Sequence, residues 1–227
     1  IGESDDLVGA NNHNLMGFYE NKRFALLNKR FMRQSIHAGD SAEVIDLRTK
    51  NFINRIKRVI TTIKAIKFIN EMSKNHKWAL KAIPLKKPYV FFYFWKKYIP
   101  KIKIIAIFRD PIVSAHSNMK VQKNGNRYED IINNWYSVNK EILYYVMTHD
   151  GIIINYDDLL DSKKLSNILI SLDEYIGVKH NHKSIEKNII SNTLNRSTLE
   201  VKHLKKCYPL NNDARILFDT MNNVKIS

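Results

Sequence analysis

Two short apolar runs, each followed within two residues by an Asp, are the clearest pattern along the chain. The run "KIKIIAIF" ends at Phe108, and the run "GIIINY" ends at Tyr156. Both are rich in β-branched residues and nearly free of polar ones, which is typical of strands covered on both faces. Asp110 and Pro111 follow the first run as an N-cap and a first-turn residue. The pattern therefore predicts a buried strand that leads directly into a helix.

Apolar residues at helical spacing predict helices before, between and after these strands. They are expected from Glu20 onward and over 52–73, 128–147, 165–176 and 214–221, with a shorter helix between Pro88 and Pro100 after a strand in "KWALKAIPL". Gly177 is expected to end the helix over 165–176. The helix over 52–73 has an apolar side with interleaved cations. The side consists of Ile53, Ile56, Ile60, Ile63 and Ile66, and the cations are Arg55, Arg58, Lys64 and Lys67.

Strands that alternate with helices predict an α/β fold in three layers, with a mostly parallel sheet flanked by helices. The sequence contains no internal repeat and no low-complexity linker, so we expect a single domain over residues 1–227. Ligands of such sheets bind outside the carboxyl ends of the strands. Arg109, directly after the first predicted strand, is therefore expected at a functional edge.

The chain is strongly basic, with 37 Lys and Arg against 22 Asp and Glu and a formal net charge of +15. This charge predicts an anionic partner, which could be a nucleotide, a nucleic acid, an acidic glycan or a membrane surface. The abundance of Ile, Asn and Lys is also typical of an AT-rich genome, which places Lys at any solvated position. Composition alone leaves both explanations open.

Cysteine, histidine and hydropathy patterns exclude several classes. Cys207 is the single cysteine, so no intramolecular disulfide can form. His180 and His182 form an isolated H-x-H without further ligands at zinc spacing, and no metal site is predicted. No run of 18 apolar residues exists, so we expect no transmembrane segment. No basic start with an apolar leader is visible, and we expect a cytoplasmic protein, although one cysteine fits a disulfide-free exported protein equally well.

The stretch "FRDPIVSAHSNMK" has the chemistry of a phosphate site. A helix N-terminus exposes N–H groups and a partial positive charge, and Arg109 adds a planar donor fork in front of it. Ser114 and Ser117 are three residues apart and share a helix face. In the alternative interpretation, Arg109 pairs with Asp110 or Asp157, and Ser117 is a small packing residue.

The strand, "RDP" and helix, with Ser117 at the eighth position after Arg109, resemble the 3′-phosphate-binding motif of sulfotransferases that use 3′-phosphoadenosine 5′-phosphosulfate (PAPS), in particular the bacterial and carbohydrate type. Further elements in the same order resemble this family over about residues 10–180. They are "NLMGFYE" (Asn14–Glu20), "LLN" (Leu26–Asn28), "LKKPYVFFYFW" (Leu85–Trp95, with Lys87 where Asp is usual), Trp135 with Asn139, and "IINYDDL" (Ile153–Leu159).

One family signature has no counterpart in this sequence. The Gly-rich loop with Arg-Ser-Gly-Thr, which grips the 5′-phosphosulfate in the family, is absent, and so is any G-x-x-x-x-G-K segment. We expect the chain to be a fragment of a P-loop-NTPase-like sulfotransferase fold that lacks the first strand, this loop and the first helix. A degenerate, inactive relative is the alternative. Activity of this piece by itself does not follow from the resemblance.

The resemblance implies transfer of a sulfuryl group from PAPS, as co-substrate, to a hydroxyl or amine of an acceptor, with a carbohydrate as the acceptor class and no metal. It implies Glu20 as the general base and Lys86 as a residue that faces the sulfate. Glu20 could equally serve the helix dipole, with His37 and His116 as other bases, and Lys86 could be solvated. The nucleotide-binding residues implied are Arg109, Ser114, Ser117 and, from the C-terminal segment, Arg196.

Two other classes of protein remain possible on sequence grounds. A relative of P-loop nucleotide kinases would use a similar fold and ATP. A basic nucleic-acid-binding protein would need cations clustered with exposed aromatic residues. The aromatic residues of this chain lie inside apolar runs, which indicates a core, so nucleic acid is not the partner that we expect.

Overall fold

The computed structural model describes residues 21–35, 52–74, 79, 95–99, 101–121, 127–179, 182 and 210–226. The chain divides into two compact units, Ile1–Lys101 and Ile102–Ser227, which we call the N-terminal and C-terminal units. One domain can contain two such units, so the single domain expected over 1–227 stays a prediction.

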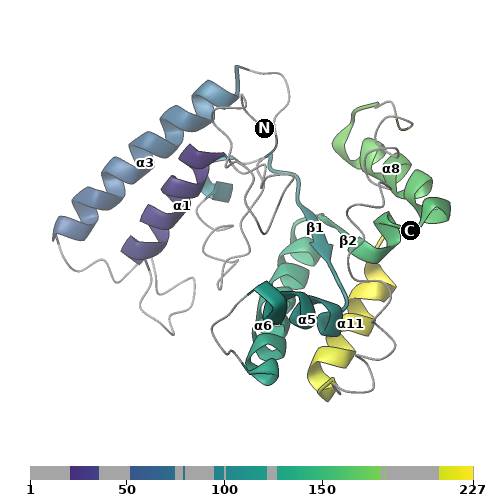
Figure 1. Ribbon diagram of the computed structural model, residues 1–227. Helices are drawn as coiled ribbons and strands as arrows, with labels where there is room; N and C mark the ends of the chain where they lie inside the picture. Colours follow the sequence, from purple (N-terminus) through teal and green to yellow (C-terminus); the bar gives the residue numbers. More distant parts are fainter. Residues whose placement is uncertain are drawn as a thin grey trace. The chain divides into compact units, whose positions relative to one another are not determined.

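The N-terminal unit contains two helices that lie side by side (Figure 1), α1 over Lys22–Ser35 and α3 over Phe52–Met72. Both helices were predicted from the spacing of their apolar residues. Asn21 is the residue before α1, and its Oδ1 accepts a hydrogen bond from the backbone N–H of Phe24 at 3.1 Å, as an N-cap does. A further helical turn at 95–98 confirms the end of the helix predicted before Pro100. The strand predicted in "KWALKAIPL" lies outside the described residues except for Ala79.

Three buried aromatic rings hold α1, α3 and the turn at 95–98 together. The ring centroids of Phe24 and Trp95 are 4.8 Å apart, those of Phe24 and Phe68 are 6.1 Å apart, and those of Phe68 and Trp95 are 6.4 Å apart. Trp95 also donates a hydrogen bond from its indole Nε1 to Oδ1 of the buried Asn28 at 2.6 Å. Aromatic rings bury large apolar areas, so this cluster is the core of the described part of the N-terminal unit.

α3 packs against the cluster with the side that the sequence analysis did not identify as apolar. Its buried residues are Thr61, Ala65, Phe68 and Met72, whereas the isoleucines of the predicted apolar side are exposed at positions 56, 60, 63 and 66. The small residues Thr61 and Ala65 let α1 approach closely, and Phe68 gains more from burial than an isoleucine would. The Thr61 hydroxyl is satisfied because it donates to the Lys57 carbonyl at 2.9 Å. The helix is therefore apolar on two opposite sides.

The C-terminal unit is helix-rich with a small sheet. Its elements are β1 (Ile105–Phe108), α5 (Pro111–Val121), α6 (Tyr128–Thr148), β2 (Ile152–Asn155), α7 (Tyr156–Leu159), α8 (Ser162–Ile176) and α11 (Asn212–Val224). The order along the chain, strand then helices then strand, confirms the alternation that predicted an α/β fold (Figure 1).

β1 and β2 pair in parallel, with Ile105 opposite Ile152 and Phe108 opposite Asn155. This confirms the predicted parallel pairing of the two apolar runs. β1 is covered on one face, because Ala106 and Phe108 are buried whereas Ile105 and Ile107 are 41% and 54% exposed. The described residues thus form a two-stranded parallel sheet, and the second covered face that a three-layer fold requires is not seen among them.

Helices α6 and α11 cover the buried face of this sheet. Trp135 of α6 is buried, and its ring lies 6.4 Å from that of Phe218 in α11. Phe108 of β1 meets the same Phe218 ring at 5.9 Å. The remaining members of this core are Ala106, Ala115, Ile131, Ile132, Val146, Ile153, Ala214, Leu217 and Met221. Residues from both ends of the unit therefore complete one core.

α8 ends as predicted and fixes the approach to β1. Gly177 is the C-cap with φ of 73°, a left-handed conformation that favours glycine. Just before it, the Tyr175 hydroxyl accepts a hydrogen bond from the backbone N–H of Ile104 at 2.9 Å. Burial raises the pKa of this hydroxyl above its ordinary value, although the hydrogen bond from Ile104 opposes the rise. The residue that precedes β1 is thereby tied to the last turn of α8.

Candidate functional site

Arg109 lies immediately after β1, at the carboxyl end of the parallel pair, as the sequence predicted. Its Nε donates to Oδ1 of Asp157 at 3.2 Å, and its guanidinium carbon lies 4.9 Å from the centre of the Tyr156 ring. The Arg109 side chain is 22% exposed and that of Asp157 is 42% exposed. Asp157 and Tyr156 thus hold the guanidinium from two directions while it keeps contact with solvent. The pairing with Asp157 is the one that the alternative interpretation named.

The N-terminus of α5 is closed by Asp110. Oδ1 of this buried carboxylate accepts hydrogen bonds from the N–H groups of Ile112 at 2.9 Å and Val113 at 3.3 Å. The Ser114 N–H bonds to the Asp110 carbonyl at 2.9 Å, and Pro111 has no N–H. This confirms the predicted cap and corrects the expectation that these N–H groups would receive a phosphate. An anion at this edge would instead depend on side-chain donors.

Two hydroxyls of α5 were predicted to serve as such donors. Ser114 is half-buried and Ser117 is exposed on the next turn. The spacing of three residues puts them on the same side of the helix. Their roles toward a nucleotide stay predictions. His116, between them, is half-buried.

The turn after β2 is held by a network that the sequence analysis did not find. Oδ1 of Asn155 accepts a hydrogen bond from the Asp157 N–H at 3.0 Å, and Nδ2 of Asn155 donates to Asn222 of α11 at 3.0 Å. Next to it, the buried carboxylate of Asp158 binds the ammonium groups of Lys164, at 2.7 Å, and Lys225. Asp157, which holds Arg109, is therefore anchored on both sides along the chain. The segment "YDDL" predicted the turn. No local pattern predicted that Asp158 and Asn155 would have partners from α8 and from the C-terminal segment.

The two lysines control the charge state of Asp158. Burial raises the pKa of this carboxyl, but the hydrogen bonds and charges of Lys164 and Lys225 outweigh burial and hold the pKa below its ordinary value of 3.8. The same contact raises the pKa of Lys164. Asp158 is consequently ionised at neutral pH. Its two ion pairs connect α7 to α8 and to the segment after α11.

We expect Asp158→Asn to lower the free energy of unfolding at pH 7 by about 1.5 kcal/mol, because two charge-assisted hydrogen bonds become weaker. A depressed pKa in the folded state stabilises the fold above the unfolded pKa and loses its effect as pH falls through the folded pKa. The difference between wild type and variant should therefore be constant near neutral pH and shrink on acidification below about pH 4. Urea unfolding at several pH values measures it, and a difference that grows on acidification would contradict the assignment.

Three predicted site residues, Glu20, Lys86 and Arg196, lie outside the described residues, as does the alternative base His37. Within the described ranges, no group of three or more His, Cys, Asp or Glu residues is arranged to hold a metal ion. His182, part of the H-x-H pair, instead contacts Oδ2 of Asp173 at 2.8 Å. None of the described helices combines the length and the apolar character that crossing a membrane requires.

Comparison with known proteins gives one structural similarity. No family model and no curated protein sequence matches the chain. Among solved structures, the chain is similar to one described as the sulfotransferase domain from the curacin biosynthetic pathway. The TM-score is 0.49 and the sequence identity is 16%, over 86% of this chain and 78% of that chain. This similarity does not assign the chain to a family.

Proposed function

We propose that this protein is a sulfotransferase, which transfers a sulfuryl group from PAPS to a hydroxyl or amine of an acceptor. The main support is the position of Arg109, Asp110 and Pro111 directly after β1, where ligands of parallel sheets bind. Ser117 stands eight residues after Arg109 on the helix that follows, in the order of the motif described above. The acceptor class proposed is a carbohydrate.

Arg109 is the residue proposed to bind the 3′-phosphate of the nucleotide, with help from Ser114 and Ser117. A guanidinium is a strong donor toward phosphate because it is always charged and its N–H groups form a rigid fork. Asp157 and Tyr156 restrict its orientation, which reduces the conformational entropy lost when the nucleotide binds. Arg196 is proposed as a further contact to this phosphate.

The proposed chemistry is an in-line transfer. The acceptor oxygen or nitrogen forms a bond to sulfur while the bond from sulfur to the phosphate oxygen breaks, and adenosine 3′,5′-bisphosphate leaves. A general base takes the acceptor proton, and Glu20 is proposed for this role. Lys86 is proposed to stabilise charge on the sulfuryl group or the leaving oxygen. Such transfers depend mostly on positioning and charge stabilisation.

A binding and transfer experiment on the full-length protein tests the proposal. We expect adenosine 3′,5′-bisphosphate to bind at least tenfold more tightly than ATP, because the 3′-phosphate adds a charge-assisted contact. Calorimetry measures both affinities, and transfer of ³⁵S from labelled PAPS to a panel of glycans then tests the reaction. Tighter binding of ATP would instead indicate a nucleotide kinase relative.

A further inference from the structure

The exposed side of α3 forms a continuous aliphatic surface. We define the outer stripe of α3 as Ile56, Val59, Ile60, Ile63 and Ile66, which are between 40% and 60% exposed. Their spacing of three and four residues puts them along one line of the helix, opposite the buried side that contains Phe68. Five exposed aliphatic side chains in a row are a costly arrangement in water, and such patches usually mark an interaction surface.

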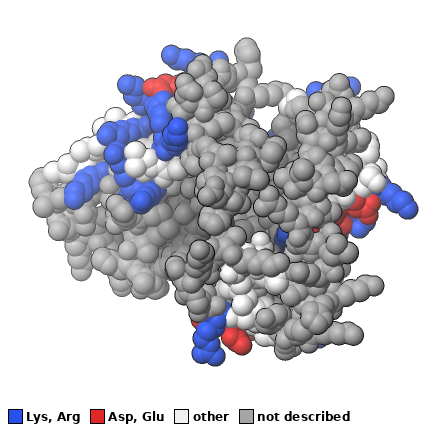
Figure 2. Space-filling view, viewed as in Figure 1, with Lys and Arg blue, Asp and Glu red and all other residues white. Residues whose placement is uncertain are grey.

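Arg58, Lys64 and Lys67 of α3 lie beside this stripe at helical spacing. Within the described parts of the N-terminal unit, Glu71 is the one carboxylate, and it is bound by Arg23 at 2.6 Å. Figure 2 shows Lys and Arg side chains gathered over α3, with uncharged side chains between them. The cations of this unit whose side chains the structure describes are Lys22, Arg23, Lys29, Arg30, Lys57, Arg58, Lys64, Lys67, Lys74, Lys96, Lys97 and Lys101.

The net charge of the whole chain is concentrated in the same unit. Residues 1–101 contain 20 Lys and Arg against 8 Asp and Glu, whereas residues 102–227 contain 17 against 14. The basic character is therefore a property of the unit that contains α3 and not of the whole chain. Lys is about equally frequent in the two units, 14 against 13, so the difference in net charge comes mainly from the small number of Asp and Glu residues in residues 1–101.

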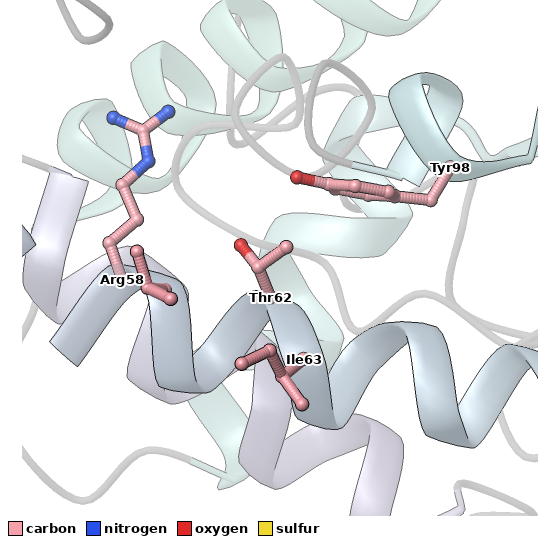
Figure 3. Close-up of a pocket in the computed structure, with 5 residues that line it drawn as sticks. Arg58, Thr62, Ile63 and Tyr98 are labelled. Carbon is pink, nitrogen blue, oxygen red and sulfur yellow. The ribbon is translucent and has the colours of Figure 1, made fainter. Parts of the chain in front are cut away.

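A hollow of about 370 Å³ adjoins one edge of the outer stripe. Arg58, Val59, Thr62 and Ile63 of α3 line it together with Tyr98 (Figure 3). Val59 and Ile63 belong to the stripe, so the hollow continues the aliphatic surface toward a guanidinium and a phenol. Arg, Thr and Tyr side chains of this kind suit the phosphate and glycerol oxygens of a lipid headgroup.

We propose that the outer stripe of α3 docks on the surface of an anionic lipid bilayer. Its aliphatic side chains would enter the boundary between headgroups and acyl chains, while the flanking lysines reach the lipid phosphates. α3 has 21 residues and is about 31 Å long at 1.5 Å per residue. This length would span a bilayer core, but the cations along the helix forbid it, and a helix of this kind lies in the interface.

The combination of an aliphatic stripe and cations favours an anionic bilayer over other anionic partners. A glycan or a nucleic acid would neutralise the lysines but would leave the isoleucines in water. A bilayer with anionic headgroups satisfies both at once, because juxtaposed basic residues are each attracted to its negative surface potential. The inference does not depend on the proposed sulfotransferase activity, since no nucleotide or acceptor takes part.

The test is co-sedimentation with sucrose-loaded vesicles. We expect at least tenfold stronger binding to phosphatidylcholine vesicles that contain about 30% phosphatidylglycerol than to pure phosphatidylcholine. Ile60→Gln with Ile63→Gln removes aliphatic contact, and Lys64→Gln with Lys67→Gln removes charge. Each pair should weaken binding to the anionic vesicles by at least fivefold.

Matched variants in the C-terminal unit serve as controls. Ile170→Gln with Ile216→Gln changes two isoleucines of similar exposure, and Lys140→Gln with Lys163→Gln changes two exposed lysines. Neither pair should alter vesicle binding. The melting temperature of every variant is measured in parallel without lipid.

Four outcomes would overturn the proposal. One is equal binding to neutral and anionic vesicles, or none. Another is equal loss in the control variants. A third is a lower melting temperature of the Ile60 and Ile63 variant, which would show that the folded chain itself covers the stripe. The fourth is a dimer in light scattering that the same variant disperses, which would make the stripe a self-association surface.

Discussion

Arg109→Ala should weaken binding of adenosine 3′,5′-bisphosphate about ten- to a hundredfold. The change removes a charge-assisted contact that is worth about 1.5–3 kcal/mol. The fold should tolerate it, because Arg109 is partly exposed and its ion pair with Asp157 is open to solvent, where such pairs contribute little to stability. Titration calorimetry measures the affinity, and circular dichroism confirms that the variant is folded.

Two comparisons make this result specific to the 3′-phosphate. Adenosine 5′-monophosphate lacks that phosphate, so its affinity should change much less. Arg109→Lys keeps the charge but loses the planar fork, and should fall between wild type and Arg109→Ala. If Arg109→Ala weakens both nucleotides by the same factor, Arg109 does not read the 3′-phosphate, and the proposed nucleotide site is wrong.

Trp95→Ala should lower the free energy of unfolding by about 4 kcal/mol, the largest effect on stability that we expect. Truncation of a large buried aromatic residue costs about 3–5 kcal/mol through lost burial and the cavity left behind. Here the change removes two ring contacts, with Phe24 and Phe68, and the hydrogen bond to the buried Asn28. Urea unfolding followed by far-UV circular dichroism measures the difference.

Trp95→Phe separates the two contributions. It keeps a ring between Phe24 and Phe68 but removes the indole N–H, and we expect a loss of about 1–2 kcal/mol. Lys97→Ala, on the exposed part of the same turn, should stay within about 0.5 kcal/mol of wild type. Trp95 variants that unfold like Lys97→Ala would mean that the aromatic cluster does not form in solution.

Sequence periodicity predicted most helices of the described residues because their apolar positions recur at one spacing. Asp110 and Gly177 marked helix ends correctly, since caps depend on local chemistry. The same reasoning chose the wrong side of α3, because the helix has two apolar sides. Only the position of Phe24 and Trp95 decides that Phe68 is the buried one, and that position is a tertiary fact.

The candidate site also has one part that could be predicted from the sequence and one part that could not. Arg109 could be placed at the end of a strand from the run that precedes it, because parallel strands end at one edge. The partners of Asp158 could not be predicted from the sequence. Lys225 is 67 residues away from Asp158 along the chain and reaches it only when α11 packs on the sheet. Long-range ion pairs leave no periodic trace in a sequence. The turn was therefore predictable, and the network that stiffens it was not.

The position of α11 has a consequence for the order in which the protein is made. Its buried residues Ala214, Leu217 and Met221 complete the core over the sheet, and the N–H of Ile226 bonds to the Ile153 carbonyl at 3.1 Å. β1, α6 and β2 leave the ribosome before this helix is synthesised, and until then α6 covers the buried face of the sheet without α11. Contacts between segments that are far apart in the sequence form slowly, and apolar strands that are exposed in the meantime can aggregate. Nascent chains arrested before Asn212 should therefore engage chaperones that bind apolar segments, and release from them should follow emergence of α11.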